Sequence, residues 1–236
     1  MFKRTSLFIA IAATLFSSSL HHEIARVTVE NVHPVHCERF GSATNLPLLI
    51  LLHGVSGPSS FYREQADFFA RHGFRVVLPH YLEGGHGPNA TDENYDAWVA
   101  AVREVMYESD SAKGGRPPAT VIVGYSLGAS VALALGSQGQ GPDAIAEFYG
   151  SLPDKYFRDL KDMPPLLILH GELDKEIPVY NARQLSQLCS DAALKCDMHI
   201  YPTEAHGFTL ENLKDADQRT LRFFSQIVAR RSAPFE

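Results

Sequence analysis

Residues 120–136 read TVIVGYSLGASVALALG, and this stretch constrains the fold more than any other part of the chain. Its first four residues predict a buried strand, and the segment from Leu127 to Gly136 predicts a helix of small and apolar residues. Between them lies Gly-Tyr-Ser-Leu-Gly, with a hydroxyl at its centre. Flanking glycines let backbone pass close by without a Cβ clash, and a tight strand–turn–helix presents its central residue at the sheet edge. The pattern therefore predicts that Ser126 is a nucleophile.

Strand and helix patterns alternate along the rest of the chain. Apolar runs predict strands at residues 26–29, 35–40, 48–52, 74–78, 120–123, 144–148, 166–169 and 198–201. Helical patterns occur at residues 59–72, 94–108, 127–136, from Pro178 onward and at 210–228. Short connections between alternating strands and helices indicate an α/β fold, in which a mostly parallel sheet is covered by helices on both faces. No linker or repeat divides residues 21–236, so we expect one domain there.

Two later strands end in polar loops that could complete a catalytic site. One is followed by HGELDKEIP, which contains Glu172 and Asp174, and the next by PTEAHGF, which contains His206. Because the carboxyl ends of parallel strands meet at one rim of a sheet, these groups can converge on the serine. His206 would accept the proton of Ser126, and Asp174 would orient the imidazole, with Glu172 as the alternative acid.

The tetrahedral intermediate of such a reaction needs hydrogen-bond donors for its oxyanion. The amide of Leu127, directly after the nucleophile, is one candidate, and the amide of Val55, in the loop after the strand at residues 48–52, is the second. Aromatic residues beside the predicted strand ends are candidates for an acyl pocket, with ordinary core packing as the alternative. These residues are Tyr81, Tyr125, Tyr149 and Phe208.

Four motifs in this order, HGVSG, GYSLG, GELDKEIP and AHGF, resemble the dienelactone hydrolase branch of the α/β-hydrolase superfamily over about residues 45–230. The resemblance implies an α/β-hydrolase fold without a large lid domain. It also assigns the roles of nucleophile, acid and base to Ser126, Asp174 and His206, and those of oxyanion donors to Val55 and Leu127. The chain departs from the family in two respects: those enzymes carry a cysteine nucleophile, and the arginines that hold their substrate carboxylate have no clear match here.

These features predict a serine hydrolase that cleaves carboxylic esters or lactones through an acyl-enzyme on Ser126. A peptidase or an acyl transferase would use the same triad, and a non-catalytic binding protein could keep the fold, although such a protein would be expected to lose a triad member. We expect neither a metal nor an organic cofactor. His80, Glu83 and His86 lack the compact spacing that is typical of metal ligands.

Residues 1–20 have the three-part pattern of a secretory signal peptide: MFKR, an apolar run from Leu7 to Phe16, and three serines. A buried N-terminal helix is the alternative. The pattern predicts an exported protein, periplasmic or secreted. Cleavage would remove Lys3 and Arg4 but no acid, which changes the formal net charge from −6 to −8. This acidic balance disfavours binding to nucleic acid or to anionic membranes, so the expected partner is a small-molecule ester.

Three cysteines bear on the same question. Cys189 and Cys196 bracket the polar segment SDAALK, and a disulfide between them would suit an oxidising compartment, with two free thiols as the alternative. Cys37 lies in a strand-like stretch. We expect no catalytic role for it, because the neighbouring His36 would point to the opposite face of a strand.

Overall fold

The structure is a computed structural model, and it describes residues 22–27, 34–41, 43, 45–111, 119–139, 141–157, 160 and 162–232. The predicted signal peptide at residues 1–20 lies outside the described residues. Among the helices that are described, none combines the length and the apolar character needed to cross a bilayer.

Eight strands of the described chain form one sheet in the order β1-β2-β4-β3-β5-β6-β7-β8. The pairings of β1 with β2 and of β2 with β4 are antiparallel, and all pairings from β4 to β8 are parallel. The strands are β1 (His22–Val27), β2 (Val35–Phe40), β3 (Leu48–Leu52), β4 (Arg75–Pro79), β5 (Thr120–Tyr125), β6 (Ala144–Phe148), β7 (Leu166–Gly171) and β8 (Cys196–Tyr201).

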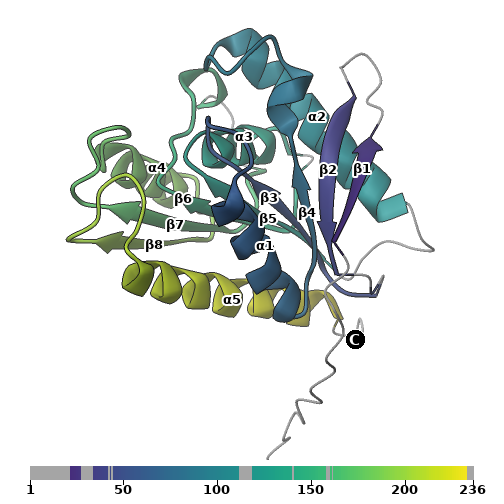
Figure 1. The fold of residues 1–236 in the computed structure, drawn as a ribbon. Helices are drawn as coiled ribbons and strands as arrows, with labels where there is room; N and C mark the ends of the chain where they lie inside the picture. The colour runs from purple at the N-terminus through teal and green to yellow at the C-terminus, as the bar shows by residue number, and fades with distance from the viewer. Residues whose placement is uncertain are drawn as a thin grey trace, which may run out of the picture.

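Helices cover both faces of this sheet (Figure 1). α1 and α5 pack on one face, and α2, α3 and α4 pack on the other. The helices are α1 (Ser60–Arg71), α2 (Asp92–Ser111), α3 (Leu127–Gly136), α4 (Tyr180–Asp191) and α5 (Leu210–Ser232), with short 3₁₀ helices η1 (Tyr81–Gly84) and η2 (Asp154–Tyr156). This arrangement confirms the predicted mostly parallel sheet between two helical layers.

The central strand β3 shows why its sequence is a continuous apolar run. Leu48, Ile50 and Leu52 belong to the core beneath α2, α3 and α4. Leu49 and Leu51 belong to the core beneath α1 and α5. All five side chains are fully buried, because successive residues of a strand point to opposite faces and both faces are covered here.

Several elements extend beyond their predicted bounds. β7 continues two residues past its last leucine, because His170 and Gly171 still pair with Ile200 and Tyr201 of β8. β1 begins at His22 rather than near residue 26, and α2 runs from Asp92 to Ser111 rather than from 94 to 108. The connection between β6 and β7, residues 149–165, carries only η2 in its described part and no lid domain.

The predicted disulfide is present and joins the end of α4 to the start of β8. Cys189 and Cys196 are bonded, with their Cα atoms 6.1 Å apart. Cys37 is buried in β2, and burial raises the pKa of its thiol to about 12. A thiol with this pKa stays protonated at neutral pH, which fits the expectation that Cys37 is not a nucleophile.

Candidate active site

Ser126 occupies the turn between β5 and α3 in a strained backbone conformation, with φ 53° and ψ −119°. The turn is tight because the chain here lies directly against the loop after β3. A Cβ on Gly128 would lie 2.4 Å from the Leu52 carbonyl oxygen and 2.5 Å from that of His53, so only glycine fits. The Ser126 amide donates to the Phe148 carbonyl at the end of β6 (2.9 Å). The strained residue is thus held on both sides by neighbouring strands.

In the predicted triad, His206 lies within hydrogen-bond distance of both Ser126 and Asp174. Ser126 Oγ is 2.8 Å from His206 Nε2, and His206 Nδ1 is 2.8 Å from Asp174 Oδ2. The imidazole is mostly buried, with 15% of the side chain exposed, and the carboxylate of Asp174 is fully buried. The groups come from the loops after β5, β7 and β8, so the carboxyl ends of three parallel strands converge as the sequence predicted.

The carboxylate of Asp174 is fixed by donors on both oxygens. Its Oδ1 accepts the amides of Glu176 and Ile177, both at 2.9 Å, which leaves Oδ2 directed at His206. His170 lies 3.3 Å from Oδ2, but its Nε2 is closer to the Ile177 carbonyl oxygen, at 2.8 Å. Burial lowers the pKa of His170, so this histidine stays neutral beside the carboxylate.

The alternative acid, Glu172, lies elsewhere. Its carboxylate forms an ion pair with Arg183 of α4, and both side chains are more than one-third exposed. The structure therefore places Asp174, and not Glu172, behind the imidazole.

The loop after β3, which carries the predicted donor Val55, runs beside the nucleophile. A Cβ on Gly54 would lie 3.6 Å from the Cβ of Ser126, and the Gly54 amide donates to the hydroxyl of Tyr62 (2.9 Å). The second predicted donor, Leu127, is the first residue of α3, where backbone amides point out of the helix N-terminus toward negative charge. Both predicted amides thus belong to segments that adjoin Ser126.

Of the four predicted pocket residues, Tyr149 lies beside His206, and Phe208 packs against Tyr149. The ring of Tyr149 packs edge-on against the imidazole of His206 with centroids 5.0 Å apart, and the ring of Phe208 lies 5.2 Å from that of Tyr149. Tyr149 also has a positive φ of 47°, so the chain turns sharply just after β6.

The other two predicted pocket residues, Tyr125 and Tyr81, are fully buried in the core, so this part of the prediction is wrong. The Tyr125 hydroxyl donates to Gln65 beneath α1 (3.0 Å). The Tyr81 hydroxyl donates to the His53 carbonyl oxygen (2.8 Å), and its ring stacks on the His53 imidazole. Both side chains pack in the core next to the loops that bear the site, and neither exposes surface to a substrate.

Tyr62 was not predicted as a site residue. It lies in the first turn of α1, and its hydroxyl accepts the Gly54 amide of the loop after β3. The only sequence feature that marks Tyr62 is its place at the start of an amphipathic helix, where an aromatic residue usually packs in the core. Tyr62 does pack against Phe61 and Tyr125, yet its hydroxyl also reaches the loop next to Ser126.

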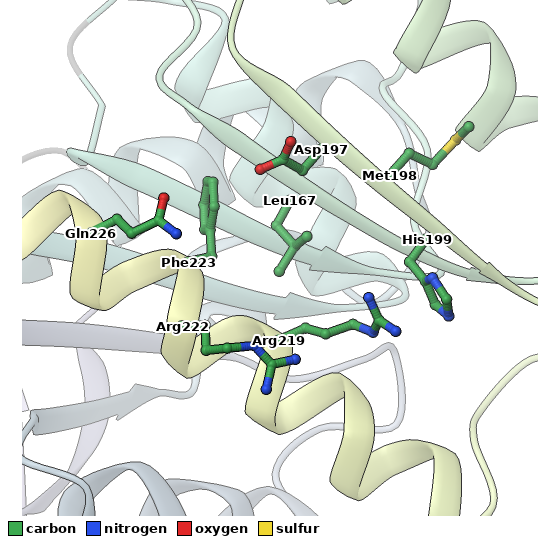
Figure 2. A pocket seen from close by; sticks show the side chains of 8 residues that line it. All are labelled: Leu167, Asp197, Met198, His199, Arg219, Arg222, Phe223 and Gln226. Atoms are coloured by element: carbon green, nitrogen blue, oxygen red, sulfur yellow. The ribbon is translucent and has the colours of Figure 1, made fainter.

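A separate shallow pocket lies between β8 and α5, away from the triad (Figure 2). Leu167 and Met198 near the amino ends of their strands contribute to it, whereas the triad follows the carboxyl ends. Of its two arginines, Arg219 forms an ion pair with Asp215 (2.6 Å). The lining residues are Leu167, Asp197, Met198, His199, Arg219, Arg222, Phe223 and Gln226.

Solved structures share this fold at low sequence identity. A Klebsiella pneumoniae protein assigned as a dienelactone hydrolase matches with a TM-score of 0.73 and 20% identity, over 87% of this chain and 99% of its own. A promiscuous, dienelactone hydrolase-like phosphotriesterase from metagenomic libraries matches with a TM-score of 0.76 and 12% identity, over 89% and 99%. An acetyl ester-xyloside bifunctional hydrolase from Caldicellulosiruptor lactoaceticus matches with a TM-score of 0.68 and 18% identity, over 82% and 88%.

These likenesses confirm the α/β-hydrolase fold. The comparison with curated proteins found no significant match. The family model described as "Dienelactone hydrolase family" matches residues 39–228, which include all the loops that bear the triad. The chain therefore belongs to the dienelactone hydrolase family.

Proposed function

We propose that this protein is a serine hydrolase that cleaves carboxylic esters or lactones through an acyl-enzyme on Ser126. The observation that carries the proposal is the unbroken hydrogen-bonded line from Ser126 Oγ through the His206 imidazole to the Asp174 carboxylate, at 2.8 Å in each step. Membership of a hydrolase family supports the general class of reaction.

The roles follow from the order of these contacts. As Ser126 Oγ attacks the substrate carbonyl, His206 Nε2 takes its proton, and Asp174 stabilises the imidazolium that forms. The imidazolium then gives this proton to the leaving alkoxide, which departs as the alcohol. A water molecule, deprotonated by the same imidazole, then attacks the acyl carbon. As the acyl–Oγ bond breaks, the imidazolium returns the proton to Ser126 Oγ and the carboxylic acid is released. The amides of Leu127 and Val55 are the proposed donors to the oxyanion of both tetrahedral intermediates.

The charge around the imidazole favours a neutral substrate. The carboxylate of Glu176, which is largely exposed, lies 3.8 Å from His206 Nε2. This carboxylate would disfavour an anionic group bound beside the imidazole, because like charges repel one another. The partly buried ring of Phe208, which packs against the largely buried ring of Tyr149, offers apolar contact near the imidazole. This supports a neutral ester rather than a dienelactone that carries a carboxylate.

The second candidate is a peptidase or an acyl transferase with the same triad, and the third is a binding protein that retains the fold. All three triad members are in place, which favours an enzyme over a binding protein.

We also propose that the protein is exported and acts on a small molecule without nucleic acid or a stable membrane partner. The signal-like pattern of residues 1–20 and the Cys189–Cys196 disulfide support export, because disulfides persist in oxidising compartments.

A fluorophosphonate probe tests the nucleophile directly. Wild-type protein should be labelled on Ser126, and Ser126→Ala should not be labelled. The matched control is Ser137→Ala, at the other end of α3, which should label like wild type. Absence of labelling in folded wild-type protein would favour a binding protein instead.

Kinetics with short-chain nitrophenyl esters test the base. His206→Ala should lower kcat by about 10⁴-fold or more, because the serine then lacks a proton acceptor. A loss smaller than about tenfold would remove His206 from this role. Parallel assays with anilides, and with an alcohol acceptor in place of water, separate esterase activity from peptidase and transferase activity.

A further inference from the structure

His36, His80 and Glu83 form a cluster outside the triad, at the rim of the sheet where β4 ends. His36 is the second residue of β2, His80 directly follows β4, and Glu83 lies in η1. One potential ligand atom from each residue lies within 4.8 Å of the other two. His36 Nδ1 is 2.9 Å and 3.0 Å from the two carboxylate oxygens of Glu83, and His80 Nδ1 is 3.7 Å from one of them.

The backbone holds these three residues in place. The His80 amide donates to the His36 carbonyl oxygen (2.8 Å), which ties the end of β4 to β2. The His36 amide in turn donates to Glu83 (2.9 Å), and the Glu83 amide donates to the His80 carbonyl oxygen (3.0 Å). Two of these bonds join backbone groups and the third is accepted by the Glu83 carboxylate, so the three side chains are brought together before any ligand arrives.

We propose that His36, His80 and Glu83 bind a divalent transition-metal ion, with Zn²⁺ as the best fit. Zinc takes imidazole nitrogen and carboxylate oxygen at about 2.0–2.1 Å in a tetrahedron, which places its ligand atoms about 3.3 Å apart. Glu83 Oε1 lies 3.0 Å from His36 Nδ1 and 3.7 Å from His80 Nδ1, on either side of this value, and one ligand atom from each of the three residues lies within 4.8 Å of the others. Two imidazoles also favour a transition metal over Mg²⁺ or Ca²⁺, which prefer oxygen ligands.

The surroundings of His80 resemble those of a metal ligand. Its Nε2 lies 3.0 Å from a carboxylate oxygen of Glu38, whose side chain is only 1% exposed. Both oxygens of Glu38 accept hydrogen bonds from Arg63 (2.8 Å each), so this carboxylate is fixed. When Nε2 donates to Glu38, the lone pair of His80 lies on Nδ1, which is the atom that faces Glu83. A carboxylate behind the distal nitrogen is the usual partner of a metal-bound histidine.

Solvent can reach the site and supply the fourth ligand. The side chains of His36 and Glu83 are 36% and 38% exposed, and that of His80 is 21% exposed. Three protein ligands and one water complete a tetrahedron.

The ion would fasten β2 to η1 and thereby support the active site without touching it. η1 also carries Tyr81, whose hydroxyl donates to the His53 carbonyl oxygen at the start of the loop that bears Val55. A metal ion bound there would restrict the motion of η1, which is hydrogen-bonded to this loop through Tyr81. The assignment does not depend on the proposed esterase activity.

Calorimetric titration of the chelator-treated protein with Zn²⁺ tests the site, and we expect one ion per chain. Glu83→Gln keeps the shape and hydrogen-bonding capacity of the side chain but removes an anionic ligand, so affinity should fall at least tenfold. His80→Ala should lower it as much. Glu38→Gln removes no ligand yet should weaken binding about 10–100-fold, because it alters the partner of the bound histidine.

Two controls separate this cluster from other histidines. His86→Ala removes a nearby exposed histidine that faces Glu93, and it should leave the affinity unchanged. His206→Ala tests whether the ion binds at the triad instead. The thermal midpoint should rise with Zn²⁺ in wild type and not in Glu83→Gln, which circular dichroism can measure together with the fold. No binding by wild type, undiminished binding by folded Glu83→Gln, or loss of binding in His206→Ala would each overturn the proposal and leave a hydrogen-bond network only.

Discussion

Glu147 is a carboxyl group buried next to the active site, and its protonation should control stability. It is the penultimate residue of β6 and is completely buried. One oxygen accepts the Gly150 amide (2.8 Å), and the other has no hydrogen-bond partner in the part of the chain that the structure describes. Burial raises the pKa of Glu147 from 4.5 to about 8, an effect that the Gly150 amide only partly opposes.

The sign of the effect on stability follows from proton binding. Between pH 4.5 and about 8 the folded protein keeps a proton on Glu147 that the unfolded chain releases. The contribution of Glu147 to the free energy of unfolding is therefore fully present below pH 4.5, and it is lost as the pH rises through about 8. At about 1.4 kcal/mol per pH unit, the loss across this range is on the order of 5 kcal/mol.

Replacement by glutamine tests this value. Glu147→Gln has nearly the same shape, cannot ionise and still offers an oxygen to the Gly150 amide. At pH 5 the variant and wild type should have free energies of unfolding within about 1 kcal/mol of each other, since both are then neutral in the fold. At pH 9 the variant should be more stable by several kcal/mol. Urea unfolding followed by circular dichroism at pH 5, 7 and 9 measures the difference.

A second buried acid must be kept apart from this effect. Burial raises the pKa of Asp217 in α5 to about 7, so wild-type stability has another source of decline in the same range. Because Asp217 is present in both proteins, the difference between them isolates Glu147. Glu211→Gln, at the exposed start of α5, is the control and should retain the pH dependence of wild type. Free energies for wild type and Glu147→Gln that run parallel from pH 5 to 9 would refute the reasoning.

Two further variants test the helix–loop packing and the disulfide. Gly128→Ala would place a methyl group 2.4–2.5 Å from the carbonyl oxygens of Leu52 and His53, so α3 must move. We expect the free energy of unfolding in urea to fall by about 1–3 kcal/mol and kcat to fall as well, and wild-type values for both would contradict the close approach. Replacing Cys189 and Cys196 by serine should lower the free energy of unfolding by about 2 kcal/mol, because the bridge closes a short loop. Ester hydrolysis should be unchanged there, since the bridge lies at the amino end of β8, and a matching loss of activity would argue against this separation.

The fold and the triad could be predicted from the sequence because both depend on local patterns. The short apolar runs at residues 48–52 and 120–123, each ended by a glycine-rich loop, are typical of strands covered on both faces. Once the strands are parallel, their carboxyl ends lie at one rim. Ser126, Asp174 and His206 then converge, whatever the precise shape of the loops that carry them.

The burial of Tyr125 could not be predicted, because it depends on where β5 ends. The strand continues through Tyr125, so this side chain falls in phase with Val121 and Val123 and enters the core beneath α1 and α5. Had the strand ended at Val123, the ring would have been free to face the rim. Where a strand ends depends on its pairing with neighbouring strands more than on its own residues. A shift of one residue in the strand turns a side chain to the opposite face.

The cluster of His36 with His80 and Glu83 was missed for a related reason. His36 lies far from the other two in the chain and reaches them only because β2 pairs antiparallel with β4, with Cys37 opposite Pro79. Of the nearby histidines, sequence spacing brought only His86 into consideration with His80 and Glu83, and a metal site there was not expected; in the structure this side chain lies near Glu93. The register of two strands that are distant in sequence is set by tertiary packing, which no local pattern encodes.

The sheet itself holds the strained residues of the active site. Ser126 and Tyr149 both have positive φ, and each directly follows a parallel strand. The Ser126 amide donates to the Phe148 carbonyl oxygen of β6, and the Tyr149 amide donates to the Leu169 carbonyl oxygen of β7. The sheet hydrogen bonds thus continue one residue past each strand and offset a strain of about 1–3 kcal/mol per residue. It follows that Ser126 and the Tyr149 ring beside the His206 imidazole are positioned by adjacent strands. If Ser126 is the nucleophile, as proposed, substitutions that loosen β6 should reduce turnover before they unfold the protein.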